Sequence, residues 1–178
     1  MDKIKLANDH KDTGNDAFKN GDFISAIRSY HHALLCVKGI LSKSTMKELG
    51  MLVGDNAAQH RANSKEEQIK EEAQSIKLSL HNNLAVCLIK QNKWERAISH
   101  CDEALMLESN NCKAIYRRGL AYLEIGNIDK AGKDLRKASA LQPHDHNIQK
   151  ALSRLGNKEK VGEQVERRMY AAMFGNKT

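Results

Sequence analysis

The sequence predicts an all-α fold that is built from helix-turn-helix units repeated along the chain. Composition is the first indication, because the 178 residues include one proline and only 4% aromatic residues, while Lys, Glu, Ala, Leu and Asn fill long spans. The second indication is a pattern of small and bulky residues that recurs with a period of about 34 residues. A chain of this length is expected to form about one domain with a working core.

The recurring pattern predicts three repeats. Positions are counted here from the first residue of each repeat. Small residues at positions 8 and 20 let two antiparallel helices approach closely, and bulky residues at positions 17 and 24 fill the space between them. Two frames that follow each other directly hold Ala85, Leu88, Trp94, Ala97, Cys101, Ala104 and Ser109, and then Gly119, Tyr122, Ile128, Ala131, Leu135, Ala138 and Pro143. An earlier frame, beginning at Ala7, holds Gly14, Ala17, Phe23, Ala26, Tyr30, Ala33 and Lys38. The step from Ala26 to Ala97 is about twice the step from Ala97 to Ala131, so an insertion slightly longer than one period separates the first two repeats.

The first repeat occupies about residues 7–40. Its first helix is expected over residues 3–20, the turn at Asn20-Gly21-Asp22, and the second helix from Phe23 to about Leu41. Most of the insertion is expected at about 42–64. Within it, residues 50–60 lack a clear apolar period and are predicted to form a mobile loop.

The second repeat occupies about residues 78–111 and the third about 112–145. A capping-box spacing at Ser64-Lys-Glu-Glu67 predicts a helix start, and that helix would run to about Gln91. After a turn, the partner helix is expected from Trp94 to about Leu107. The third repeat has its turn at Gly126-Asn127, and Pro143 ends its second helix.

A C-terminal helix is expected to follow the three repeats of residues 1–143. An array of repeats leaves its last apolar face uncovered, so a capping or extension helix is predicted in residues 144–178, ending near Gly175. Its apolar residues are Ile148, Leu152, Leu155, Val161, Val165, Met169 and Met173.

Charge and segment type restrict the partners. The net charge of +7 favours an acidic partner, such as a carboxylate-rich peptide, a nucleic acid or an anionic membrane. No apolar run of about 18 residues would span a membrane, and no signal-peptide pattern opens the chain. The four cysteines lack a C-x-x-C spacing and are expected to be buried free thiols in a reducing compartment. These features predict a cytoplasmic protein.

The sequence contains no pattern typical of a catalytic or metal site. His31 and His32 are adjacent, so they point about 100° apart on a helix and do not form an i, i+4 ligand pair. No Gly-rich phosphate loop and no nucleophile-base signature is present. We therefore expect no catalytic residues, no metal site and no cofactor, and predict that the chain is not an enzyme. Nucleic-acid binding is disfavoured because the expected groove lacks stacked aromatic residues.

Polar residues gather on one stripe of the first helix of each repeat, at positions 2, 5, 6 and 9. Lysine and arginine supply charge-assisted donors and asparagine amides add neutral ones, a combination suited to a peptide carboxylate. A carboxylate, Asp12, occupies position 6 of this stripe in the first repeat, and it is expected to pair with Lys11 or with another cation. The donors are Lys11 and Asn15 in the first repeat, Asn82 and Asn83 in the second, and Lys113 and Arg117 in the third. Val86, Tyr116 and Arg118 are candidate contacts to other residues of such a peptide.

The pattern of small and bulky residues resembles the tetratricopeptide repeat family over nearly the whole chain. The resemblance implies a right-handed superhelix in which the first helix of each repeat lines the concave surface. Lys11-x-x-x-Asn15, Asn83-Leu-Ala and Lys113-x-x-x-Arg117 look like the carboxylate clamp of chaperone-binding members. Those members are co-chaperones that hold the Glu-Glu-Val-Asp tail of Hsp90 or Hsp70. The clamp residues implied here are Lys11, Asn15, Asn83, Lys113 and Arg117.

Two branches of that family remain open. Residues 83–88, 113–119 and 168–174 look like the tetratricopeptide half of large FK506-binding immunophilins, whereas residues 30–39, with the insertion that follows, look more like the small tetratricopeptide repeat protein 9 group. The chain opens on its first repeat, so we expect either a member of the small group or the targeting part of an isomerase. Immunophilin tails also carry a proposed calmodulin site, which makes the basic C-terminal helix an alternative calmodulin ligand.

Overall fold

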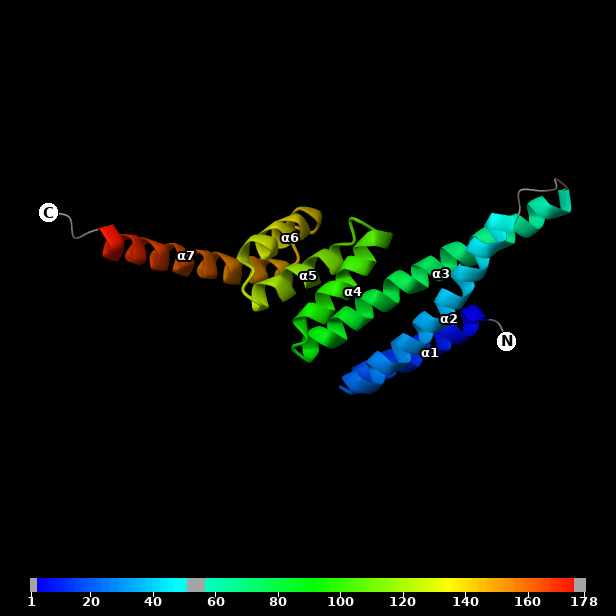
Figure 1. Ribbon diagram of the computed structural model, residues 1–178. Helices are drawn as coiled ribbons and strands as arrows, with labels where there is room; N and C mark the ends of the chain where they lie inside the picture. The colour runs from blue at the N-terminus through cyan, green and yellow to red at the C-terminus, as the bar shows by residue number, and fades with distance from the viewer. Residues whose placement is uncertain (1–2, 51–56, 175–178) are drawn as a thin grey trace. The chain divides into compact units, whose positions relative to one another are not determined.

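The computed structural model describes the backbone of residues 3–50 and 57–174, and the side chains of residues 3–42 and 65–174. Over this part of the chain the fold contains helices and no strand (Figure 1), so the predicted all-α class is confirmed. The helices are α1 (Lys3–Lys19), α2 (Phe23–Gly50), α3 (Ala57–Lys90), α4 (Trp94–Leu107), α5 (Cys112–Glu124), α6 (Ile128–Leu141) and α7 (His146–Phe174).

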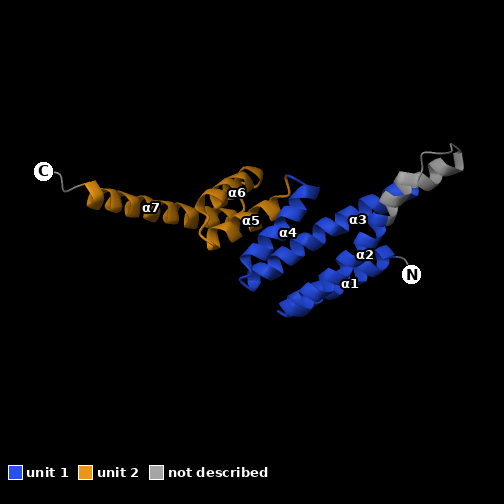
Figure 2. Ribbon diagram, viewed as in Figure 1, with its two compact units in different colours: residues 1–109 blue, residues 110–178 orange. Residues whose placement is uncertain are grey.

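The chain divides into two compact units (Figure 2). Unit 1 contains residues 1–109 and holds α1 to α4, while unit 2 contains residues 110–178 and holds α5 to α7. In the described residues of each unit, no helix is both long enough and apolar enough to cross a bilayer.

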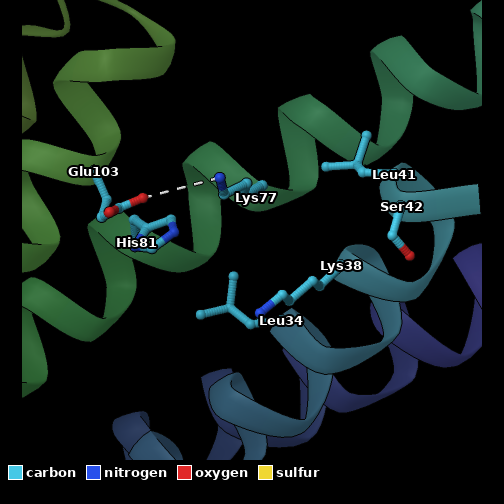
Figure 3. Close-up of a pocket in the computed structure, with 7 residues that line it drawn as sticks. All are labelled: Leu34, Lys38, Leu41, Ser42, Lys77, His81 and Glu103. Atoms are coloured by element: carbon cyan, nitrogen blue, oxygen red, sulfur yellow. Dashed lines mark ion pairs between the residues drawn. The ribbon is translucent and has the colours of Figure 1, made fainter. Parts of the chain in front are cut away.

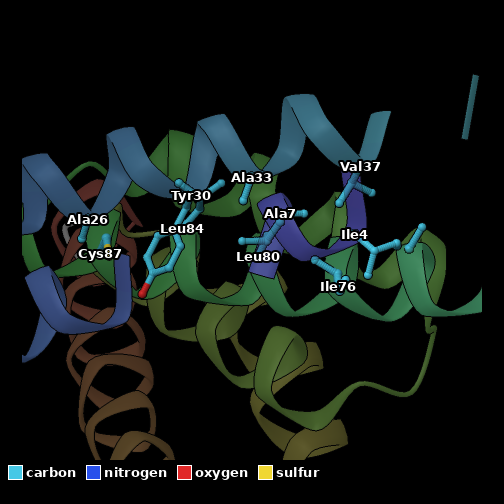
Figure 4. Close-up of a cluster of buried hydrophobic side chains, with 11 residues drawn as sticks. Ile4, Ala7, Ala26, Tyr30, Ala33, Val37, Ile76, Leu80, Leu84 and Cys87 are labelled. Atoms are coloured by element: carbon cyan, nitrogen blue, oxygen red, sulfur yellow. The ribbon is translucent and has the colours of Figure 1, made fainter. Parts of the chain in front are cut away.

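The helices of unit 1 pack through the predicted pattern of small and bulky residues. Gly14 of α1 lies against Tyr30 of α2 so closely that a Cβ there would come within 2.5 Å of the tyrosine ring. Figure 4 shows Tyr30 and Val37 of α2 in one cluster with Leu80 and Leu84 of α3, and all four side chains are buried. This core fixes α1 and α3 as neighbours, which matters for the polar residues that they carry.

The turns within the three helical hairpins share one backbone feature, a residue with a positive φ. Gly21, Asn92 and Gly126 each adopt a positive φ, at 78°, 56° and 82°. This left-handed conformation ends a helix, and glycine or asparagine adopts it at low cost. The steps between these three positions equal those between Ala26, Ala97 and Ala131, so the turns follow the spacing of the sequence pattern.

Unit 2 repeats the close approach seen in unit 1. A Cβ at Gly119 of α5 would lie 3.0 Å from the Leu135 side chain of α6. Beside this contact, Arg118 donates from Nε and Nη2 to the two carboxylate oxygens of buried Asp134, at 2.7 and 2.8 Å. A bidentate pair of this kind fixes the orientation of both side chains as well as adding energy. The hairpin of α5 and α6 is therefore held by apolar packing and by one ion pair.

Only the first half of α7 covers the hairpin of unit 2. Ile148, Ala151 and Leu155 are buried, and Lys158 Nζ donates to the carbonyl of Leu123 at 2.8 Å. The expectation that the whole apolar stripe caps the repeats is corrected for its second half, because α7 runs past the ends of α5 and α6 there (Figure 1). The exposed apolar residues of that half are Val161, Val165, Met169, Tyr170, Met173 and Phe174.

The insertion is more helical than its sequence suggested. Helix α2 continues to Gly50 rather than ending near Leu41, and α3 begins at Ala57, so Ser64 lies inside a helix and is not its first residue. Strong helix formers such as Lys, Met, Glu, Leu and Ala extend both helices without an apolar period. The central part of the predicted loop, residues 51–56, lies outside the described residues.

The cysteines are free thiols, as expected. Cys87 and Cys101 are buried, and Cys36 and Cys112 are half-buried.

Candidate peptide-binding site

Two of the predicted clamp residues meet inside unit 1. Asn83 of α3 donates its side-chain N–H to Asn15 Oδ1 of α1 at 3.1 Å, although 68 residues separate them in sequence. Tyr30 of α2 donates its hydroxyl to the same oxygen at 2.9 Å. Three helices thus share one amide oxygen, which fixes the orientation of the Asn15 side chain.

Lys11 lies one helical turn before Asn15 and is half-buried. Its ammonium donates to Asn8 Oδ1 at 2.8 Å, and an ammonium has three N–H groups to offer. The nearby carboxylate of Asp12 accepts a hydrogen bond from Asn15 Nδ2 at 3.3 Å. The sequence left open whether Lys11 pairs with Asp12. In the structure Lys11 instead contacts the Asn8 side chain, and Asp12 contacts the Asn15 side chain.

The structure separates the two adjacent asparagines of α3. Asn82 is buried and donates to the carbonyl of Leu78, one turn earlier, at 3.3 Å. Asn83 is half-buried and reaches α1 instead. The residue pattern left both as candidates, and only the family resemblance selected Asn83.

Tyr30 is a supporting residue that the sequence reading missed. Burial, with a smaller contribution from the Cys87 thiol, raises its pKa to about 12, although a hydrogen bond to Asn83 opposes this shift. The phenol therefore stays protonated and remains a donor to Asn15 at neutral pH. The signal was present in the sequence, because the equivalent positions hold Cys101 and Leu135, and a buried tyrosine requires a polar partner.

Unit 2 carries the two predicted clamp cations on α5. Lys113 is exposed in the first turn, and Arg117 is half-buried four residues later, so both lie on one face of the helix. Asn111 caps the start of α5, because its side-chain oxygen accepts a hydrogen bond from the backbone N–H of Ala114 at 3.0 Å. Two cations near a helix N-terminus together create a positive potential that favours an anion.

The proposed accessory residues have defined places. Tyr116 packs against the core of unit 2, where burial and the carboxylate of Asp145 raise its pKa. The guanidinium of Arg118 holds Asp134, as described above. Val86 is half-buried on α3. Contacts from these three residues to a peptide stay predictions, and for Arg118 such a contact would involve a guanidinium that is already in a bidentate pair.

Histidines form a separate group in unit 1. The Nδ1 atoms of His81 and His100 lie 3.1 Å apart, and the His31 ring lies 5.8 Å from the His100 ring. Burial, with the cation of Lys77, lowers the pKa of His81 to about 4, and burial with His81 does the same for His100. Among the described residues, no group of three or more His, Cys, Asp or Glu side chains is arranged to hold a metal ion.

Two segments of the chain match the tetratricopeptide repeat family, over residues 79–111 and 113–145. The chain therefore contains tetratricopeptide repeats, within an all-α fold of that class. Among curated proteins, it is similar to the peptidyl-prolyl cis-trans isomerase FKBP42 of Arabidopsis thaliana, with 40% identity over 105 residues. That match covers 59% of this chain and 29% of the relative, so the chain spans less than a third of the relative's length.

Solved structures agree with this fold. The C-terminal TPR-containing domain of a putative FK506-binding protein of Plasmodium falciparum is 26% identical with a TM-score of 0.71, covering 91% of this chain and 93% of that one. The myosin chaperone UNC-45 of C. elegans, in complex with an Hsp90 peptide, is 25% identical with a TM-score of 0.63. That match covers 94% of this chain and 16% of UNC-45. The chain is thus similar to tetratricopeptide domains of immunophilins and of Hsp90 co-chaperones.

Proposed function

We propose that this protein is a non-enzymatic adaptor that binds the acidic C-terminal tail of Hsp90, or of Hsp70, in the cytoplasm. The residues that would hold the tail are Lys11, Asn15 and Asn83 of unit 1 and Lys113 and Arg117 of unit 2. The observation that carries the proposal is the hydrogen bond between Asn83 and Asn15. It orients two amides from helices far apart in sequence, and one of them, that of Asn15, lies one turn after Lys11.

The chemistry of these side chains fits a carboxylate. Asn15 and Asn83 each have an amide N–H group beyond their mutual hydrogen bond, and the ammonium of Lys11 has N–H groups beyond its bond to Asn8. Lys113 and Arg117 add two positive charges. A charge-assisted hydrogen bond contributes roughly 1.5–3 kcal/mol, so a handful is enough for micromolar binding of a short tail.

The comparison with UNC-45 supports the identity of the ligand. That protein is similar to this chain over 94% of the chain, and its structure contains an Hsp90 peptide. An acidic tail also suits the net charge of +7.

A peptide titration tests the proposal. An acetylated Met-Glu-Glu-Val-Asp peptide and its C-terminally amidated form would be titrated into the protein by isothermal calorimetry. We expect the amidated form to bind at least tenfold more weakly, because it lacks the terminal carboxylate. Equal affinities for the two forms would reject a clamp for the chain terminus. A parallel titration with the Hsp70 tail would measure the preference between the two chaperones.

A second candidate function is favoured by the similarity to FKBP42 and to the Plasmodium protein. In that case the chain is the targeting domain of an FKBP-type peptidyl-prolyl isomerase, and it carries the same tail-binding role for a catalytic domain encoded elsewhere in a longer protein. Sequencing the full transcript distinguishes the two, because an isomerase would require an FK506-binding domain in the same reading frame.

A further inference from the structure

Unit 1 contains a cavity that the proposed peptide site does not use. It has a volume of about 410 Å³ and is lined by residues of α2, α3 and α4 (Figure 3). Pockets that bind small ligands commonly measure about 300–1,000 Å³. The lining residues are Leu34, Lys38, Leu41, Ser42, Lys77, His81 and Glu103.

The cavity faces away from Asn83. His81 and Asn83 are two positions apart on α3, so their side chains point about 200° apart around the helix axis. Lys77 lies one turn before His81 and shares its face, and both line the cavity. A ligand in the cavity would therefore not meet the hydrogen bond between Asn15 and Asn83.

The walls combine an apolar side with two cations. Leu34 and Leu41 come from α2, which also supplies Lys38, while Lys77 comes from α3. Lys77 Nζ lies 3.9 Å from a carboxylate oxygen of Glu103, a long contact that leaves the ammonium N–H groups able to turn toward a ligand. In the part of the chain that the structure describes, no carboxylate pairs with Lys38.

The remaining polar groups add no charge at neutral pH. The His81 ring faces His100, and its burial keeps it neutral, since the pKa is lowered to about 4. Two ammonium groups and one carboxylate thus leave the cavity with a single net positive charge. One anion would neutralise that charge, whereas a cation would be repelled by the two ammonium groups.

We infer that this cavity binds an aliphatic monocarboxylate, with its carboxylate between Lys38 and Lys77 and its chain against Leu34 and Leu41. Leu34 and Leu41 of α2 supply apolar surface, and Lys38 of α2 and Lys77 of α3 supply positive charge to the same cavity. These groups match a ligand with one charged end and one hydrocarbon end. A free fatty acid and the C-terminal aliphatic residue of a protein share this chemistry.

The test uses octanoate, octanol and octylammonium, titrated separately into the full chain by calorimetry. We expect octanoate to bind and the two other ligands to bind at least tenfold more weakly, because they lack the negative charge. Equal binding of octanol and octanoate would overturn the inference, and so would the absence of octanoate binding. The affinities of octanoate and N-acetylleucine distinguish the two sources. Tighter binding of octanoate indicates a free fatty acid, and tighter binding of N-acetylleucine indicates a protein C-terminus.

Variants locate the ligand in this cavity. Lys38→Gln should weaken octanoate binding about tenfold, the loss of one charged contact, while Lys90→Gln at an exposed position of α3 should leave it unchanged. The double variant Lys77→Gln/Glu103→Gln removes both charges of the ion pair, so it leaves neither of them without its partner, and it should also weaken octanoate binding. Unchanged affinity in folded Lys38→Gln would overturn the placement.

The Met-Glu-Glu-Val-Asp peptide separates this inference from the proposed function. Because the cavity faces away from Asn83, saturating peptide should leave the octanoate affinity unchanged. Absence of peptide binding in the unsubstituted protein, which still binds octanoate, would reject only the adaptor proposal. Competition between peptide and octanoate would contradict a separate site.

Discussion

Asn83 and Asn15 are joined by a 3.1 Å hydrogen bond between helices α3 and α1, and Tyr30 donates to the same Asn15 oxygen. This arrangement gives Asn15 a structural role in addition to the proposed binding role. Its oxygen satisfies one partly buried amide and one phenol, so its removal leaves two donors without their acceptor.

Substitutions at this oxygen should be graded in their effect on stability. Asn15→Ala should lower the free energy of unfolding by about 2–3 kcal/mol, because it leaves two donors unsatisfied. Tyr30→Phe removes one donor and keeps the packed ring, so its cost should be about 1 kcal/mol. Urea titrations followed by circular dichroism measure both. Equal costs for the two variants would show that the shared oxygen is not the origin of the effect.

The clamp cations should act on binding and not on folding. Lys113→Ala removes an exposed ammonium, so the free energy of unfolding should change by less than about 0.5 kcal/mol. The affinity for the Met-Glu-Glu-Val-Asp peptide should fall about tenfold, corresponding to one charged contact. Arg117→Ala should weaken the peptide similarly, and rising salt should weaken it further because the charges are partly exposed. Lys133→Ala, on the exposed surface of α6, is the matched control. Unchanged affinity in both clamp variants would contradict the proposed site.

The close helix approaches predict opposite effects for two glycine substitutions in unit 2. Gly119→Ala places a Cβ 3.0 Å from the side chains of Asp134 and Leu135, and overpacking of this kind costs about 1–3 kcal/mol. Gly156→Ala meets nothing within 4 Å on α7, so the better helix propensity of alanine should stabilise the protein by about 0.5–1 kcal/mol. Thermal unfolding by calorimetry compares them. A stabilised Gly119→Ala variant would contradict the tight contact.

Much of the fold follows from the sequence because the repeat pattern and the packing have the same cause. Gly14 against Tyr30 and Gly119 against Leu135 occupy the same pair of positions in their repeats, so the repeat pattern predicts both contacts. The helical extension of α2 to Gly50 could not be predicted from an apolar period, since high helix propensity produced it without one. The hydroxyl of Tyr30 was missed for a different reason. Its hydrogen bond depends on where α1 brings Asn15, which is a tertiary contact.

The histidine group predicts a dependence of stability on pH. His81 and His100 have pKa values of about 4 in the folded state, below the ordinary 6.5, because burial disfavours the charged ring. Lys77 and His31 oppose the protonation of His81. His31 and Arg96 oppose the protonation of His100, whereas the Glu103 carboxylate favours it. Between pH 6.5 and about 4 the unfolded state therefore binds more protons, and stability falls as the pH falls.

Urea unfolding at pH 7.5, 6.0 and 5.0 measures this dependence. The loss is at most about 1.4 kcal/mol per pH unit for each histidine. His100→Phe removes one of the two groups and should flatten the profile, whereas His144→Gln, at an exposed position of unit 2, should not. A profile that His100→Phe leaves unchanged would show that other groups cause the dependence.

The apolar face in the second half of α7 is exposed, so we expect it to contribute to binding and not to folding stability. Met169 is 59% exposed and Val165 is 49% exposed, so Val165→Glu and Met169→Glu should change the free energy of unfolding by less than about 0.5 kcal/mol. Leu155→Ala, in the packed half of the same helix, should cost about 2–5 kcal/mol. The cations Arg167 and Arg168 flank the exposed apolar residues, a pattern typical of helices that bind calmodulin. Titration with fluorescent calmodulin and calcium tests that ligand, and the expected result is binding that Met169→Glu weakens. Strong destabilisation by Val165→Glu would instead show that this half of α7 packs against the protein, as the sequence first suggested.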